Sequence, residues 1–155
     1  MSQKGMSLIE ILVVVTIFAI LGILTTQAVF LTLQGSKKSE STVRVRENLD
    51  YAVGVMERHL RNANSIVSCS MGVINYTDQN GSAGSFSCID NYVASGSARL
   101  TSDTVSIESC SFTCTTGVST NPPLVNISLE AQDANIIGIQ NTTVSTSTQI
   151  YLRSY

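Results

Sequence analysis

A long apolar run near the N-terminus, carrying one carboxylate, constrains the fold of this chain more than any other feature. Residues 6–33 are mostly apolar, and Glu10 is the only charged residue among them. About 20 helical residues, rising about 1.5 Å each, cross the hydrocarbon core of a bilayer, so residues 11–33 are long enough to span it. An acid at the centre of a membrane helix costs roughly 2.5 to 3.5 kcal/mol, and less near an end. That cost indicates that Glu10 has a partner for its charge.

The residues around the start of this run form a specific motif. Lys4 and Gly5 precede Met6, and Glu10 follows just before the uninterrupted apolar stretch. This arrangement resembles the class III signal of type IV pilins and pseudopilins, over residues 4 to about 24. The resemblance implies that a membrane-embedded prepilin peptidase cuts between Gly5 and Met6 and methylates the new N-terminus. It also implies that Glu10 meets the N-terminal amine of a neighbouring subunit in a filament.

Two other interpretations fit part of the same segment. In an ordinary secretory signal peptide, Lys4 would supply the positive charge and Thr26-Gln27-Ala28 a cleavage site of small residues. In a plain single-pass anchor, the apolar run alone would suffice. Glu10 argues against both, because it lies where the apolar region of such segments is uninterrupted.

After the apolar run the pattern changes to that of an amphipathic helix. Gln34-Gly35-Ser36 precedes Lys37-Lys38, which predicts a membrane exit with a helix break at Gly35. Residues 39–64 then read as a second helix, capped by Ser39, with Gly54 as a weak point. Apolar residues at spacings of three and four form one stripe that we expect to pack on a sheet. The stripe consists of Val45, Leu49, Ala52, Val53, Met56, Leu60 and Ala63.

One departure from the resembled family concerns proline. Major pilins often carry a proline that kinks the N-terminal helix, but this sequence has none before Pro122. The departure suggests a straighter helix, or one that melts at Gly22, and is compatible with a minor pilin or pseudopilin. The end of the chain and residues 56–63 also look like J-type minor pseudopilins, a looser match than the N-terminal one.

The remainder of the chain reads as β-structure rich in Ser, Thr, Asn and Gly. Alternating patterns predict short strands joined by turns, which favours antiparallel pairing. Residues 78–82 contain Asn80-Gly81, a strong hairpin signal. The expected strands cover residues 73–76, 85–93, 104–108, 111–114, 124–130, 135–139 and 148–152.

Four cysteines, Cys69, Cys88, Cys110 and Cys114, lie in this β-rich region. An even number on the exported side of a membrane helix favours disulfides. Of the three pairings that four cysteines allow, the simplest joins Cys69 to Cys88 and Cys110 to Cys114. Free thiols are the main alternative. A zinc site is a weak one, since no Cys-x-x-Cys pair occurs and the single histidine, His59, lies on the expected helix.

The composition excludes several other classes of function. The net charge is −2, and from residue 65 onward the only basic residues are Arg99 and Arg153, so the head does not resemble a nucleic-acid-binding surface. We find no glycine-rich phosphate loop, no calcium loop and no credible Ser/His/Asp set, because His59 has no partner in the pattern. The sequence therefore predicts no enzyme, no cofactor and no metal site.

These observations predict an α+β, pilin-like chain in which a long N-terminal helix, half transmembrane and half amphipathic, packs on an antiparallel β-sheet head. We expect a leader at residues 1–5, a transmembrane assembly segment at 6–34, a stem helix at 35–64 and an exported head at 65–155. The resemblance implies a structural subunit of a pilus or of a pseudopilus such as that of type II secretion. Its partners would be the prepilin peptidase, the bacterial cytoplasmic membrane and other pilin-like subunits. A pilus-tip binding module, either an adhesin or a DNA-uptake minor pilin, is the alternative.

Overall fold

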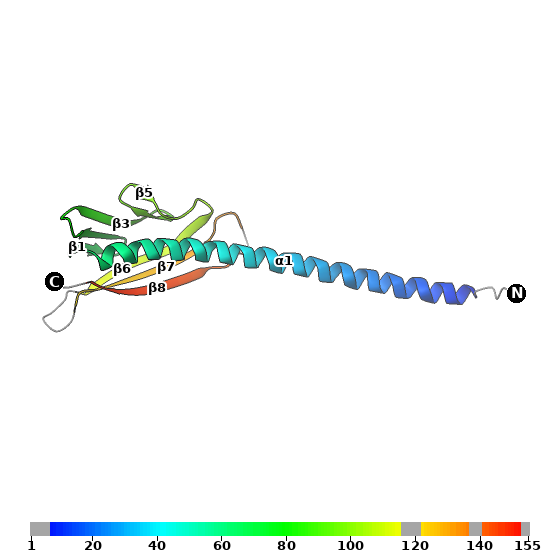
Figure 1. Ribbon diagram of the computed structural model, residues 1–155. Helices are drawn as coiled ribbons and strands as arrows, with labels where there is room; N and C mark the ends of the chain where they lie inside the picture. Colours follow the sequence, from blue (N-terminus) through cyan, green and yellow to red (C-terminus); the bar gives the residue numbers. More distant parts are fainter. Residues whose placement is uncertain (1–6, 116–121, 137–140, 153–155) are drawn as a thin grey trace. The chain divides into compact units, whose positions relative to one another are not determined.

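The computed structural model of the chain describes residues 7–115, 122–136 and 141–152. Within them, one long helix is followed by strands that pair antiparallel, which gives an α+β, pilin-like architecture (Figure 1). Compactness divides the chain into Met1–Lys37 and Lys38–Tyr155. From here on, we call the second unit the head; it includes residues 38–61 of the helix in addition to the residues 65–155 that the sequence assigned to the exported head. The elements are α1 (Leu8–Arg61), β1 (Ser65–Ser70), β2 (Val73–Thr77), β3 (Ala83–Ile89), β4 (Tyr92–Ser95), β5 (Ala98–Arg99), β6 (Val105–Thr115), β7 (Leu124–Asp133) and β8 (Val144–Tyr151).

Helix α1 is continuous over 54 residues, so the expected helix break at Gly35 is wrong. Ser39 does not cap a second helix, because it lies inside α1, and the helix does not melt at Gly22. An isolated glycine costs a helix only about 1 kcal/mol relative to alanine. Neither Gly22 nor Gly35 is accompanied by a proline, which would remove a backbone hydrogen bond. The helical hydrogen bonds therefore run through both positions.

Inside the head, the last part of α1, residues 38–61, forms the stem. Its buried side chains follow the stripe predicted from the sequence, with Val53 partly buried beside it. They recur every three or four residues and so lie on one face of the helix. The fully or almost fully buried residues of the stem are Ser41, Val45, Leu49, Ala52, Met56 and Leu60.

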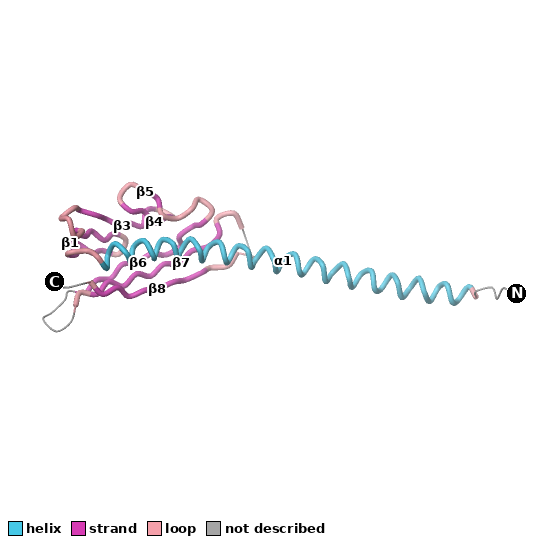
Figure 2. The backbone as a smooth tube through the Cα atoms, viewed as in Figure 1, coloured by secondary structure: helices cyan, strands magenta, loops and turns pink. Residues whose placement is uncertain are grey.

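The expected antiparallel β-structure is confirmed, and its strands form two sheets (Figure 2). Sheet A has the order β1-β2-β3-β4-β5, and sheet B has the order β6-β7-β8. Within each sheet, consecutive strands of the sequence pair with each other, as short turns permit. The turn at residues 78–82 is confirmed, with Gly81 at φ 81° and Asp78 accepting hydrogen bonds from the backbone N–H groups of Asn80 and Ser82.

One apolar core joins the stem to both sheets. Sheet A contributes Ile74 and Phe86, and sheet B contributes Phe112, Ile127 and Ile150, all with an exposed fraction of 2% or less. These residues belong to one cluster with the buried face of the stem. The stem stripe thus finds its partners within the chain.

Three strand assignments differ from the sequence prediction. The segment 85–93 is not one strand, because a tight turn at Asp90 and Asn91 divides it into β3 and β4; Asp90 adopts φ 50°, which short polar side chains tolerate. The predicted strands at 104–108 and 111–114 are parts of one strand, β6, which begins at Val105 and has a register shift between Ile107 and Ser109. Such a bulge inserts a residue without ending the strand.

Two strands, β1 and β5, were not predicted, because the adjacent apolar residues Ile66 and Val67 break the alternation in Ser65–Ser70 and because Ala98–Arg99 is very short. The strand expected at 135–139 is wrong at its start, since Asn135 lies in a turn. Its residues 137–139 fall outside the described part of the chain. Strands β2, β7 and β8 occur where strands were expected, with β7 and β8 longer than predicted.

Candidate functional site

The start of α1 places Glu10 in the first helical turn. The backbone carbonyl of Ser7 accepts hydrogen bonds from the N–H groups of Glu10, at 3.0 Å, and Ile11, at 3.4 Å. A carboxylate in this turn is favoured by the partial positive charge at a helix N-terminus. Gly5 and Met6, the predicted processing residues, lie outside the described residues.

We call residues 8–33 of α1 the apolar segment, and the hydroxyl groups of its threonines form hydrogen bonds within the helix itself. The hydroxyl of Thr16 donates to the carbonyl of Leu12 at 3.1 Å, and that of Thr32 donates to Ala28 at 2.9 Å. Thr25 and Thr26 both donate to the carbonyl of Gly22. Bonds of this kind let hydroxyls enter an apolar environment without an unpaired donor. Glu10 differs from these residues, since the ion pairs among the described residues do not include it.

The large apolar side chains between Leu8 and Leu33 are all exposed, with exposed fractions from 42% at Val14 to 78% at Leu8. Burying one such side chain completely is worth about 1.5 to 3 kcal/mol. An 18-residue window of α1 has a mean hydropathy of 2.8, and the helix is long and apolar enough to cross a membrane. The segment therefore needs a bilayer or other apolar helices to cover it.

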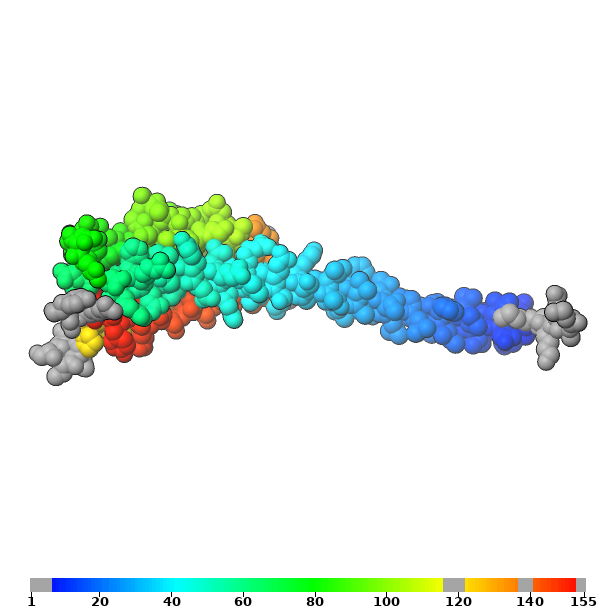
Figure 3. Space-filling view, in the orientation of Figure 1, coloured from blue at the N-terminus to red at the C-terminus, as the bar shows by residue number. Residues whose placement is uncertain are grey.

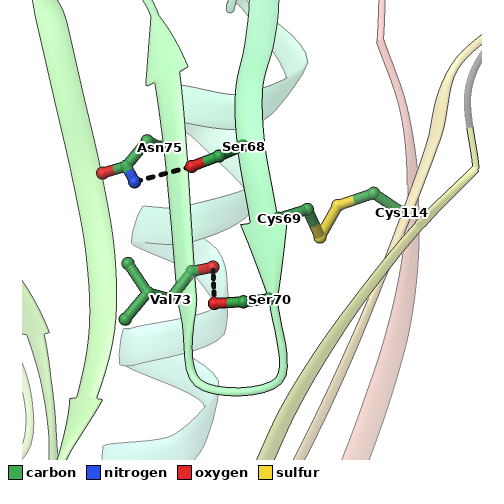
Figure 4. The surroundings of a disulfide bond; sticks show 6 residues. All are labelled: Ser68, Cys69, Ser70, Val73, Asn75 and Cys114. Atoms are coloured by element: carbon green, nitrogen blue, oxygen red, sulfur yellow. Dashed lines mark hydrogen bonds between the residues drawn. A yellow bond between two sulfur atoms is a disulfide. The ribbon is translucent and has the colours of Figure 1, made fainter.

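The four predicted disulfide cysteines form two bonds that join the sheets. Cys69 of β1 is bonded to Cys114 of β6, with their Cα atoms 6.1 Å apart (Figure 4). Cys88 of β3 is bonded to Cys110 of β6, with Cα atoms 6.3 Å apart. The second bond is nested inside the first along the sequence. Together they attach two strands of sheet A to the edge strand of sheet B.

The preferred pairing of Cys69 with Cys88 and of Cys110 with Cys114 is therefore wrong. Strand β2 lies between β1 and β3, which separates Cys69 and Cys88 by two strand spacings, roughly 9 to 10 Å. Cys110 and Cys114 lie on the same strand, about 13 Å apart at a rise of about 3.3 Å per residue. Both separations exceed the limit of about 7 Å between the Cα atoms of bonded cysteines. Nearness in the sequence was the wrong criterion.

Polar contacts between the stem and the sheets were missed by sequence reasoning. Arg44 approaches the Asp133 carboxylate at 3.7 Å, and this carboxylate, only 1% exposed, also accepts a hydrogen bond from the N–H of Asn135 at 2.9 Å. The side-chain oxygen of Asn48 accepts a hydrogen bond from the N–H of Ser102 at 3.0 Å. Asp133 looked like one of several dispersed acids in the sequence. These contacts fix the stem to the end of β7 and to the loop that contains Ser102.

A cavity of about 530 Å³ lies beside Asp133. Amide side chains line much of it, together with the hydroxyl of Ser106 and the apolar Ile136. In the described part of the chain, no group of three or more His, Cys, Asp or Glu residues could hold a metal ion. The amides lining the cavity belong to Asn91, Gln132 and Asn141.

His59 is exposed on the stem and lies near two aromatic rings of sheet A. Its ring centroid is 6.4 Å from that of Tyr76 and 6.0 Å from that of Phe86. The rings of Tyr76 and Phe86 stack at 5.4 Å. Burial raises the pKa of the Tyr76 hydroxyl above its ordinary value, and the nearby Asp78 carboxylate adds to this shift. The arrangement packs aromatic rings against the stem.

Comparison with known families and proteins adds one finding. Residues 1–26 match the prokaryotic N-terminal methylation motif, which contains Gly5, Met6 and Glu10. No curated protein and no solved structure matches the chain. The match agrees with the lone carboxylate at the start of an exposed apolar helix and with the disulfide-bonded β-rich head behind it. The N-terminus of this chain is therefore the class III prepilin signal of type IV pilins and pseudopilins, the mark of a type IV pilin-like precursor.

Proposed function

We propose that the chain is a minor pilin or pseudopilin, a structural subunit that is processed and then assembled into a pilus or pseudopilus. Prepilin peptidase cuts between Gly5 and Met6 and methylates the amine of Met6. The subunit then leaves the membrane and packs by α1 against other subunits. The observation that carries this proposal is a methylation motif over residues 1–26 joined to an apolar run, residues 6–33, in which Glu10 is the only charged residue.

The energetics of the exposed apolar segment support assembly through α1. Extracting residues 11–33 from a bilayer removes apolar side chains from hydrocarbon, at a cost set by their area. Apolar helices of neighbouring subunits restore that burial in a filament core. The head needs no such partner, because its core is already filled by the stem and both sheets. The chain thus separates an assembly surface from a self-contained folded unit.

Glu10 is proposed to set the register between neighbouring helices. A buried carboxylate is tolerated only when a charge or hydrogen-bond donor compensates it. The amine of Met6 in an adjacent subunit would supply that compensation, since Met6 precedes Glu10 by only four residues in the sequence of every copy. Wrong registers leave Glu10 without a partner and are therefore disfavoured.

The proposed location is the bacterial cytoplasmic membrane, crossed once by α1, with the head on the exported side before assembly. Two features support this orientation. The class III signal directs export of the C-terminal part, and the two disulfides of the head suit an oxidising compartment. The acidic head, in which Arg99 and Arg153 are the only basic residues after residue 65, supports a structural role without direct nucleic-acid binding.

A substitution at Glu10 tests this function. Glu10→Ala removes a polar cost, so the protein should insert in the membrane at least as well as wild type. The variant should still be cut after Gly5. Its amount in the sheared-filament fraction should fall about tenfold or more, which corresponds to a loss of about 1.4 kcal/mol in the free energy of assembly. Gln27→Ala is the matched control, since it removes an uncharged polar group from the same segment and should leave assembly unchanged. Equal recovery of Glu10→Ala and wild type in filaments would contradict the proposal.

A further inference from the structure

The edge strands of the two sheets differ in how they are protected from pairing with another chain. Edge strands are usually blocked by bulges, charges, prolines, short length or a covering element. Strand β1 has a register shift between Ile66 and Ser68 and is held to sheet B by Cys69. Strand β5 has only 2 residues and includes the charged Arg99. Strand β6 has a bulge, carries Glu108 and forms both disulfides.

Among the residues that the structure describes, strand β8 has none of these protections. It is 8 residues long and contains no charged residue and no proline. Its pairing with β7 runs from Val144 to Tyr151 without a register shift. No strand pairs with its outer side among the described residues. In the space-filling view β8 (red) lies at the surface along the lower margin of the head (Figure 3).

One hydrogen bond shows which backbone groups of β8 point outward. The N–H of Leu152 donates to the carbonyl of Pro123 at 3.0 Å, so residue 152 faces β7. Along an antiparallel strand, successive residues direct their N–H and C=O groups alternately to one side and the other. Every second residue counted back from 152 therefore also faces β7. The intervening residues present their N–H and C=O groups to the open edge, and they are Ser145, Ser147, Gln149 and Tyr151.

A groove of about 320 Å³ runs beside the start of this edge. On the β8 side it is lined by Val144, Ser145 and Thr146, and on the stem side by Arg46, Leu49 and Asp50. The two charged residues of the groove have opposite signs, and β8 itself is uncharged. A strand seated here therefore meets a surface without net charge, which favours an uncharged strand over an acidic or basic one.

We propose that the outer edge of β8 accepts an uncharged, extended segment of a neighbouring pilin-like subunit, which adds to sheet B as a fourth strand. An extended chain is the ligand whose backbone groups match a row of open N–H and C=O groups, and such pairing supplies affinity through the main chain. The choice of a neighbouring subunit rests on the proposed function, because the class III signal delivers the chain to an assembly of similarly processed subunits.

The test uses the full-length chain in its native host, with a benzophenone amino acid in place of Gln149 as a photo-crosslinker. Ser147→Pro removes an outward N–H and leaves the ladder to β7 intact, as edge strands tolerate. Ser147→Lys keeps the backbone N–H and adds a charge at the edge. This variant replaces Ser147→Pro in the test if the proline variant unfolds. Ser147→Ala is the matched control, because it keeps both the backbone donor and the neutral edge.

We expect the crosslinker to form an adduct with an uncharged segment of another chain that carries a class III signal. The yield of this adduct should fall at least tenfold in Ser147→Pro and Ser147→Lys and should be unchanged in Ser147→Ala. Thermal unfolding of each variant shows whether the head is folded. Unchanged adducts in both disruptive variants, adducts only to chains without a class III signal, or no adduct from subunits recovered in filaments would each overturn the proposal. Absence of the wild-type chain from filaments would instead contradict the proposed function, and with it this inference.

Discussion

The two halves of α1 belong to one continuous helix but differ in where their apolar side chains find partners. In the stem, Val45, Leu49, Met56 and Leu60 are fully buried against the two sheets. In the apolar segment, Leu12, Leu21 and other residues of similar size are at least half exposed. Burial in the stem stabilises the head directly. Burial of the apolar segment depends on a membrane or on other molecules.

The polar residues of the two halves also differ in where their hydrogen-bond and ion-pair partners lie. Around the stem, Arg44 and Asn48 make contacts with Asp133 and Ser102, which belong to the same chain. In the apolar segment, the threonine hydroxyls are satisfied by their own helix, and Glu10 is the one charge left over. The side chains of the stem therefore stabilise the fold of the head. Those of the apolar segment are suited to a membrane or to contact with other apolar helices.

The largest expected effect comes from removing a disulfide of the head. The bond between Cys69 and Cys114 spans a sequence separation of 45, for which chain entropy gives about 4 kcal/mol. Replacing both cysteines by serine should lower the free energy of unfolding of the head by about that amount, measured by near-ultraviolet circular dichroism in detergent. Helical signal from the apolar segment should persist after the head has melted. A loss below about 1 kcal/mol would contradict this account of the head.

The same substitution in each half of α1 tests the comparison itself. Leu49→Ala removes a side chain that is 0% exposed and should cost the head about 3 kcal/mol, because a cavity remains. Leu21→Ala removes one that is 51% exposed and should change head stability by less than about 0.5 kcal/mol. Thermal unfolding of both variants in the same detergent measures the difference. Similar losses in the two variants would show that the apolar segment is part of the folded core.

Alanine substitutions at two glycines should have smaller effects on the stability of the head, and the two effects should be of opposite sign. A Cβ at Gly84 would overlap the ring of Tyr76, which is paired opposite it on β2, so Gly84→Ala should cost about 1 to 3 kcal/mol by overpacking. Gly54, inside the stem, has no atom within 4 Å of such a Cβ. Gly54→Ala should therefore stabilise the helix by up to about 1 kcal/mol. Denaturant midpoints of the two variants should move in opposite directions, and a shared direction would refute the packing of Tyr76 on Gly84.

The smallest effect is a pH dependence that arises from Tyr76. Its pKa is raised in the folded head, so above an unfolded-state value of about 10 the unfolded chain loses this proton first. Stability is then full below pH 10 and falls as the pH rises towards the folded pKa. Tyr76→Phe should remove this part of the fall, as measured by chemical unfolding at a series of alkaline pH values. An unchanged slope in Tyr76→Phe would assign the dependence to other groups.

The sequence predicted the features that depend on local pattern. The stem stripe, the apolar segment, the position of Glu10 and the turn before Ser82 follow from periodicity, composition and short motifs. The helix break at Gly35 was wrong because one glycine is too weak a signal to end a helix that is favoured on both sides. The division of 85–93 depended on Asp90 and Asn91, whose turn signal the apolar alternation obscured.

Features that depend on pairing between distant strands could not be predicted from the sequence. The disulfide pattern follows from the order of strands in sheet A, which places β2 between Cys69 and Cys88. The contact of Arg44 with Asp133 joins the stem to the end of β7, and nothing local indicates it. The open edge of β8 likewise depends on which strand is last in sheet B.

A class III prepilin signal leaves the apolar run, residues 6–33, in the mature chain, whereas an ordinary signal peptide is removed together with it. Mass spectrometry of the native N-terminus distinguishes the two most directly. The account predicts that the mature chain begins at Met6 with a methylated amine and keeps the whole of α1, Leu8–Arg61. A mature chain that begins near Val29, after Thr26-Gln27-Ala28, would show that a signal peptidase had removed the apolar segment and would contradict the account.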